Sequence, residues 1–204
     1  FVIHSRGQDL LDGLAMWKEK ARKEVADYAF HMAVTWWGDK TRAEMQQCVS
    51  QEGIPSFKTF MAYRGAIGVD DYELVHVMET ARDAGGLVTV HAEHGDVVVA
   101  LQKKLVAEGK LEPKYHAISR PAPVEGEATG RAIMMARLLG EPVYVVHVTC
   151  REAIDAIAEA RRTREDHVAQ QLVIDADAIF FGDIGLARGR ADLIISITAG
   201  VDGD

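Results

Sequence analysis

Three side chains of the kinds that bind metal ions lie in or directly after apolar, strand-like runs. His91 follows the run Leu87–Val90, His147 follows the run Val143–Val146, and Lys58 lies inside a third run. Imidazole nitrogen is a favoured zinc ligand, and residues that end neighbouring strands of one parallel sheet meet at the same edge. The pattern therefore indicates a candidate metal site, in which two metal ions could share a hydroxide. Taken singly, such a histidine is more often a packed core residue, and it is the paired placement that favours the metal site.

The third run, Ser56–Tyr63, places Lys58 among apolar residues on an expected strand. Burying an ammonium group is costly unless its charge is altered or paired. From the residues alone, two structural explanations of Lys58 stay open beside a chemical role. The lysine can extend its ammonium to solvent, or it can be ion-paired within the core.

The elements that must position these side chains alternate along the chain. Apolar residues at three- and four-residue steps predict helices, and valine-rich runs between them predict strands. Such alternation indicates parallel βαβ units and an α/β fold. Gly85 and Gly140 follow two of the helices, where a left-handed cap favours glycine. The predicted helices are 9–25, 41–51, 70–84, 97–108, 125–139 and 151–162, and the predicted strands are 28–35, 56–63, 87–92 and 143–149.

The pattern changes after Arg164. Short Val, Ile and Phe runs broken by glycines between residues 172 and 197 predict antiparallel β structure. We therefore divide the chain into residues 1–164, a (β/α) unit, and residues 165–204, a β-rich segment.

Composition excludes several classes of partner and compartment. The chain has 204 residues, 48% of them hydrophobic, and a net charge of −8, with basic and acidic residues interspersed, so no nucleic-acid partner is expected. No apolar run approaches the ~20 residues of a membrane-spanning helix, so no membrane partner is expected either. Cys48 and Cys150 are too far apart for a zinc knuckle and fit a reducing environment, so we expect a soluble cytoplasmic protein.

The motifs Ser-Phe-Lys58-Thr-Phe-Met-Ala-Tyr63, Val-His91-Ala-Glu-His-Gly-Asp and Val-Val-His147-Val-Thr resemble those of the dihydropyrimidinase/D-hydantoinase family in order and spacing. That resemblance covers roughly residues 1–162. It implies a (β/α)8 TIM-type barrel of the amidohydrolase type, of which only part is represented. Residues 165–204 resemble a segment of that family's small β-sandwich domain, together with the lead-in to its first barrel strand.

The resemblance also implies a ligand set. Lys58 would be carboxylated on its side-chain nitrogen and would bridge two zinc ions, with His91 and His147 on the second ion. Tyr63 would stabilise the oxyanion of the reaction. The family's His-x-His pair and late-strand aspartate, which hold the first ion, are not in this sequence. We therefore expect the 204 residues to be an incomplete part of a longer chain.

Polar residues beside His91 have supporting roles in this interpretation. Glu93 could orient a ligating histidine, and Asp96 is expected to cap the helix that follows. His94 is interpreted as a residue outside the ligand set.

The function implied by the resemblance is hydrolysis of the cyclic amide of dihydropyrimidines or 5-substituted hydantoins. A hydroxide bridging the two metals would open the ring to an N-carbamoyl amino acid, and the family's usual homotetramer would be the assembly. Alternatives are allantoinase, dihydroorotase and a non-catalytic dihydropyrimidinase-related scaffold. Phe-Met-Ala-Tyr argues for a hydantoinase, and the presence of Lys58, His91 and His147 together argues against a scaffold.

Overall fold

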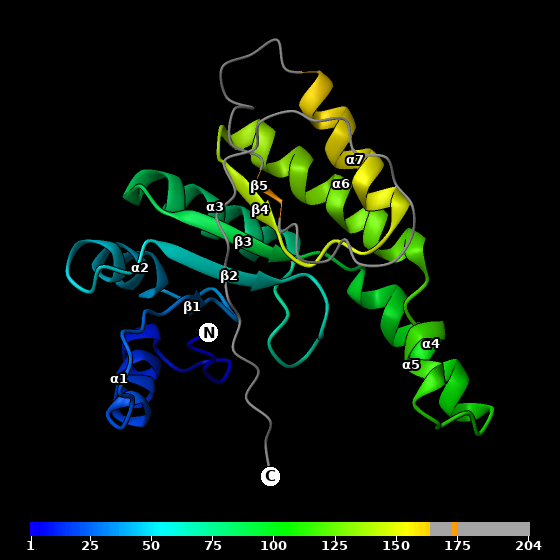
Figure 1. The fold of residues 1–204 in the computed structure, drawn as a ribbon, viewed down its shortest axis with the longest axis horizontal. Helices are drawn as coiled ribbons and strands as arrows, with labels where there is room; N and C mark the ends of the chain where they lie inside the picture. Colours follow the sequence, from blue (N-terminus) through cyan, green and yellow to red (C-terminus); the bar gives the residue numbers. More distant parts are fainter. Residues whose placement is uncertain (164–172, 175–204) are drawn as a thin grey trace.

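A computed structural model describes residues 1–163 and Val173–Ile174 of the chain. Its centre is a parallel sheet in which the strands follow one another in chain order (Figure 1). Val2 adds a parallel bridge to the first of them through Met32. The strands are β1 (Met32–Ala33), β2 (Ser56–Phe60), β3 (Leu87–His91), β4 (Val143–Val145) and β5 (Val173–Ile174).

Helices connect the strands, and most of them pack side by side. Contacts join α1 to α2, α2 to α3, α3 to α6, and α6 to α7, so the helices form a layer alongside the sheet. The pair α4 and α5 extends away from this layer (Figure 1). Sequential parallel strands with intervening helices are the arrangement of a (β/α) barrel wall. The helices are α1 (Leu10–Ala21), α2 (Thr41–Ser50), α3 (Asp71–Ala84), α4 (Gly95–Ala107), α5 (Lys114–Ile118), α6 (Ala122–Leu139) and α7 (Arg151–Arg162).

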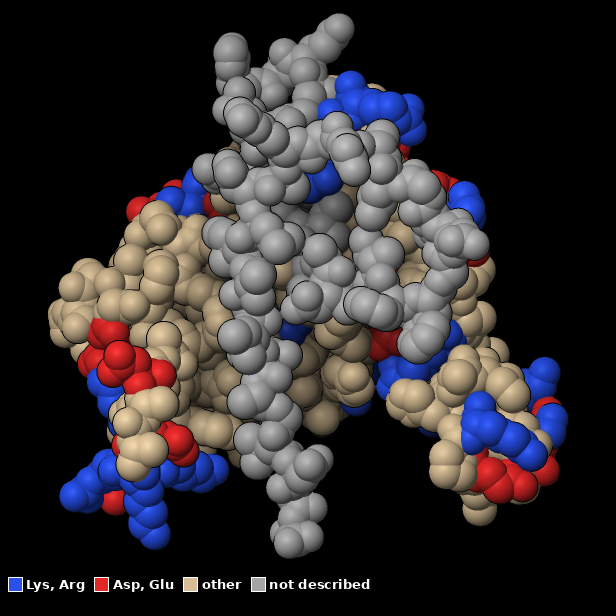
Figure 2. Space-filling model, viewed as in Figure 1, with Lys and Arg blue, Asp and Glu red and all other residues tan. Residues whose placement is uncertain are grey.

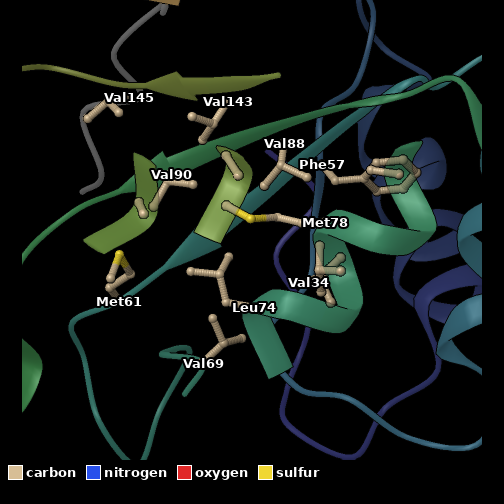
Figure 3. Close-up of a cluster of buried hydrophobic side chains, with 14 of the residues drawn as sticks. Val34, Phe57, Met61, Val69, Leu74, Met78, Val88, Val90, Val143 and Val145 are labelled. Atoms are coloured by element: carbon tan, nitrogen blue, oxygen red, sulfur yellow. The ribbon is translucent and has the colours of Figure 1, made fainter. Parts of the chain in front are cut away.

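The two faces of the sheet differ in chemistry because successive side chains of a strand point to opposite faces. One face carries Phe57, Val88, Val90, Val143 and Val145, which pack with side chains of α3 in the buried apolar core (Figure 3). The opposite face carries the residues at alternate positions of the same strands. The sheet thus separates an apolar core from a face of mixed polarity, which carries Lys58, Thr89 and His91 as well as Phe60 and Leu87.

Local sequence explains where the helices begin and end. Asp70 caps α3 by accepting a hydrogen bond from the Glu73 backbone N–H, and the Glu73 side chain accepts from the Asp70 N–H in return. Gly85 and Gly140 end α3 and α6 with φ of 75° and 68°, as the sequence predicts. These left-handed caps cost glycine little.

Several element boundaries differ from the prediction. The first strand is only Met32–Ala33, because the chain before it has no ladder partner in the described residues beyond Val2. α4 begins at Gly95 because His94, not Asp96, is its N-cap and accepts from the Val97 N–H. The prediction for Asp96 was wrong, and α5 was not predicted.

The C-terminal part was predicted to be antiparallel. Its described residues, Val173–Ile174, pair in parallel with β4. The remainder of the predicted 165–204 segment lies outside the described residues.

The surface shows mixed charge. In the view of Figure 2, basic and acidic side chains lie next to one another instead of forming a stripe of one sign. Within the described part of the chain, no helix is long and apolar enough to cross a bilayer.

Candidate metal and catalytic site

The predicted site residues meet at the carboxyl ends of β2, β3 and β4. Phe60 of β2 pairs with His91 of β3, and Lys58 pairs with Thr89, so Lys58 lies two residues deeper on the same face as His91. His147 follows β4 by two residues. The structure therefore brings together on one sheet edge three residues that are far apart in sequence.

Lys58 is buried, with 2% of its surface exposed. Its ammonium nitrogen has no hydrogen-bond partner among the described residues, and the nearby groups are the rings of Phe60 and Phe1, at 4.9 and 5.8 Å from Nζ. Burial lowers the pKa of Lys58 to about 7. Neither a solvent-directed nor an ion-paired lysine describes this side chain, so its amine is available in the neutral form near neutral pH.

His91 and His147 face each other. Nδ1 of His91 lies 2.9 Å from Nε2 of His147, which places one shared proton between the two rings. Burial, and then the charges of His91 and Lys58, lower the pKa of His147. Its backbone φ is +40°, a conformation that L-residues rarely adopt and that active sites retain.

Glu93 fixes the far side of the His91 ring. Its Oε2 accepts a hydrogen bond from Nε2 of His91 at 2.6 Å and a second one from Nη1 of Arg120. Burial opposes ionisation of Glu93, but these hydrogen bonds and the charges behind them outweigh it and lower the pKa of Glu93. The ring proton of His91 is thereby held on Nε2, which leaves the Nδ1 lone pair directed at His147.

Tyr63 lies beside His91 in the loop after β2. Its ring centroid is 5.0 Å from that of His91 and 5.8 Å from that of Phe60, and 40% of the residue is exposed. Its φ of 59° is left-handed, and its carbonyl accepts from the backbone N–H groups of Ala66 and Gly68. The turn therefore holds the phenol at the open edge of the site.

A second carboxylate holds the loop that carries His147. Glu125, in the first turn of α6, accepts from the Thr149 N–H at 2.7 Å and from its hydroxyl at 2.5 Å. A pocket lies between these groups. It is lined by His91, Ala92, Glu93, Glu125, Val145, Val146, His147 and Thr149.

The described residues fit part of a metal site. The facing ring nitrogens of His91 and His147 would bind a zinc ion, for which imidazole is a favoured ligand. Lys58 adds a buried nitrogen that lacks a partner among the described residues, and a carboxyl group on it would supply anionic oxygen. Within the described part of the chain, no group of three or more His, Cys, Asp or Glu side chains is placed so that it could hold a metal ion. This half-complete set needs further ligands.

Two residues at the site were not predicted. Arg120 lies two residues before α6 and Glu125 lies in its first turn, and both are distant in sequence from the strands that they support. The only sequence signal is that both lie within four residues of Pro121, where a helix begins. Glu93 orients His91, as predicted.

Comparisons with known proteins give a consistent result. The chain is 43% identical over 162 residues to D-hydantoinase of Geobacillus stearothermophilus and 42% identical over 163 residues to dihydropyrimidinase of Dictyostelium discoideum. Each match includes 79% of this chain but only 34% and 32% of the relative, so the chain spans about a third of their length. No family model matches the chain.

Solved structures agree with the sequence comparison. The fold superimposes on the 2.8 Å crystal structure of D-hydantoinase from Bacillus sp. AR9 with a TM-score of 0.79 at 43% identity. That match covers 86% of this chain and 37% of the other.

Proposed function

The chain belongs to the dihydropyrimidinase/D-hydantoinase family, and from this premise we propose that the protein hydrolyses the cyclic amide bond of dihydropyrimidines or 5-substituted hydantoins. The product would be the ring-opened N-carbamoyl amino acid. One observation carries the proposal. A buried lysine without a partner in the described part of the chain, Lys58, shares a sheet edge with the facing pair His91 and His147.

We propose that Lys58 is carboxylated and, with His91 and His147, helps to hold two zinc ions. The low pKa of Lys58 supports this, because carbon dioxide reacts with a neutral amine and not with an ammonium group. The reaction forms an N–C bond and releases one proton, and it turns an unfavourable buried cation into an anionic ligand. Bound zinc supplies an activated water and polarises the substrate carbonyl.

The residues of this chain have distinct tasks in the proposed reaction. Tyr63 directs its hydroxyl at the substrate carbonyl and donates to that oxygen as negative charge develops on it. Glu93 holds the His91 ring proton on Nε2, and Glu125 fixes the loop of His147. The pocket beside these groups receives the ring. Transfer of a proton to the leaving nitrogen needs a group from outside this sequence, in the family an aspartate.

The test uses the full chain that carries these residues. Wild type and Lys58→Ala are compared for zinc content, for intact mass in bicarbonate, and for ring opening of dihydrouracil, hydantoin, allantoin and dihydroorotate. We expect two zinc ions per wild-type chain and turnover of dihydrouracil or hydantoin, with both lost in Lys58→Ala. A Lys58→Ala protein that keeps two zinc ions and full turnover contradicts the site assignment.

The same experiment distinguishes the alternative functions, which are another cyclic amidase and a non-catalytic scaffold. Turnover of allantoin or dihydroorotate alone identifies a different cyclic amidase. A wild-type chain that binds no zinc and opens none of the four rings is a non-catalytic scaffold.

We also propose that the protein is a homotetramer, as the resemblance implies, and that it is cytoplasmic, as its two widely spaced cysteines suggest. Sedimentation of the zinc-loaded full chain measures the assembly. A monomer at micromolar concentration contradicts it.

A further inference from the structure

Arg120 joins two parts of the site that otherwise belong to different elements. It precedes α6, and its side chain is 13% exposed. One end of its guanidinium donates to Glu93, which holds His91. Its central carbon also lies 5.5 Å from the ring centroid of Tyr63, within the range of a cation–π contact.

We propose that Arg120 is a positioning residue that sets the His91 ring through Glu93 and the Tyr63 phenol through direct stacking. This inference rests on the proposed function, because it gives Tyr63 and His91 their tasks. Arg120 itself does not touch the reacting atoms in this scheme. The orientation of Tyr63, the oxyanion donor, thus depends on the same Arg120 side chain that orients His91, a metal ligand.

The geometry at Glu93 supports the first half of the proposal. The Oε2 atom of Glu93 accepts from both Nε2 of His91 and Nη1 of Arg120, and the Glu93 side chain is only 14% exposed. A carboxylate shared in this way cannot turn from the ring without also breaking an ion pair of low exposure. Arg120 therefore restricts Glu93 to the orientation in which the Nδ1 lone pair of His91 is free for a metal ion.

The geometry at Tyr63 supports the second half. The phenol ring contacts His91 on one side, and the guanidinium lies over the ring as well. Tyr63 is 40% exposed, so neighbours cover only part of its surface. A planar cation stacked on it limits the rotation that this exposure would otherwise allow.

Two substitutions separate the two contacts. Arg120→Met removes the charge and the stacked plane while keeping an unbranched side chain. Arg120→Lys keeps a positive charge for Glu93 but loses the planar group over Tyr63. Arg131→Met is the matched control, because Arg131 is 18% exposed and pairs with Asp71 and Glu127 away from the site.

The first measurement uses the zinc-free full chain. Two-bond nitrogen–proton NMR correlations at one fixed pH report which ring nitrogen of His91 carries the proton. We expect the Nε2-protonated form in wild type and Arg131→Met, and a mixture of tautomers in Arg120→Met. Zinc affinity should fall about 10- to 100-fold in Arg120→Met and recover in Arg120→Lys.

The second measurement is turnover at saturating zinc. Both Arg120 variants should lose kcat with little change in KM, because Tyr63 acts on the oxyanion and not on ground-state binding. In a Glu93→Gln background, Arg120→Met should have little further effect on zinc affinity, since both substitutions affect zinc binding through the same ligand, His91.

The outcomes are distinguishable. An Arg120→Met protein with the wild-type His91 tautomer and wild-type zinc affinity overturns the proposal. If Arg120→Met does not fold, the proposal is tested with Arg120→Lys and Glu93→Gln instead. An unchanged kcat in Arg120→Lys would overturn the part of the proposal in which Arg120 positions Tyr63. If wild type turns over no cyclic amide, the proposed function fails, while the tautomer and zinc affinity still test the role of Arg120.

Discussion

Burial of Lys58 predicts a pH-dependent stability that can be measured without any substrate. The pKa of Lys58 falls from its ordinary 10.5 to about 7 on folding. Between these values the unfolded chain holds a proton that the folded chain does not, so stability rises with pH across this window. Below it, the folded protein bears the full cost of a buried ammonium group.

The size of the effect follows from the same shift. A difference between 10.5 and about 7 corresponds to about 5 kcal/mol as an upper bound, and relaxation around the charge reduces it. Lys58→Met keeps an unbranched side chain, one atom shorter than that of lysine, and removes the charge. We expect Lys58→Met to raise the free energy of unfolding by about 2–5 kcal/mol near pH 6 and to change it little near pH 10.

Urea unfolding of the metal-free full chain, in buffers depleted of carbon dioxide, measures this difference. Taking wild type against Lys58→Met at each pH cancels the titration of cysteines and tyrosines that both proteins share. Lys103→Met, a change at an exposed lysine of α4, is the matched control and should show no such difference. Parallel pH profiles for wild type and Lys58→Met would refute the argument from burial. Added bicarbonate should stabilise wild type alone, because carbon dioxide in equilibrium with it carboxylates the neutral amine of the folded chain and releases one proton.

Three further substitutions test other parts of the structure. Burial raises the pKa of Glu141 to about 7, so the free energy of unfolding should fall as pH rises from 4.5 to 7. Glu141→Gln should raise the free energy of unfolding, measured in urea, by about 1–3 kcal/mol at pH 8 and change it little at pH 4. A Cβ on Gly68 would lie 1.9 Å from the Ala62 carbonyl oxygen, so Gly68→Ala should lower the free energy of unfolding by about 1–3 kcal/mol. It should also lower kcat, because the Gly68 N–H donates to the carbonyl of Tyr63 and helps to hold that residue. An unchanged stability and an unchanged kcat would contradict this packing. Thr149→Val removes the hydroxyl contact with Glu125 and should cost about 1 kcal/mol and weaken zinc binding in a titration.

Sequence patterns predicted the strands and helices well where local chemistry determines them. The box formed by Asp70 and Glu73 and the left-handed glycine at 85 mark both ends of α3, and each device lies within a few residues of the helix terminus. The prediction failed where an end depends on tertiary contacts. The strand before His147 stops at Val145 instead of 149, because the chain turns into a left-handed conformation at His147 itself.

The site residues likewise divide into those that the strand pattern predicts and those that depend on tertiary contacts. Lys58 and His91 were found because they interrupt or end apolar strands, and a parallel sheet brings such ends together. Arg120 could not be found from the same rule, since it lies outside every strand and its partner Glu93 is 27 residues away. The five-residue helix α5 just before it is too short to show an apolar stripe. A residue defined only by a long-range ion pair leaves no periodic trace in the sequence.

The sheet also explains how the chain tolerates an unfavourable lysine at its centre. Lys58 follows Phe57, and the two side chains point to opposite faces of β2. Phe57 is fully buried against the helix layer, where a large aromatic side chain contributes about 1.5–3 kcal/mol by burial. That gain is of the same order as the cost of the neighbouring lysine, and it arises on a face that has no part in the chemistry. Strand β2 can therefore keep an amine that has no partner among the described residues, because its stability comes from the other side of the sheet.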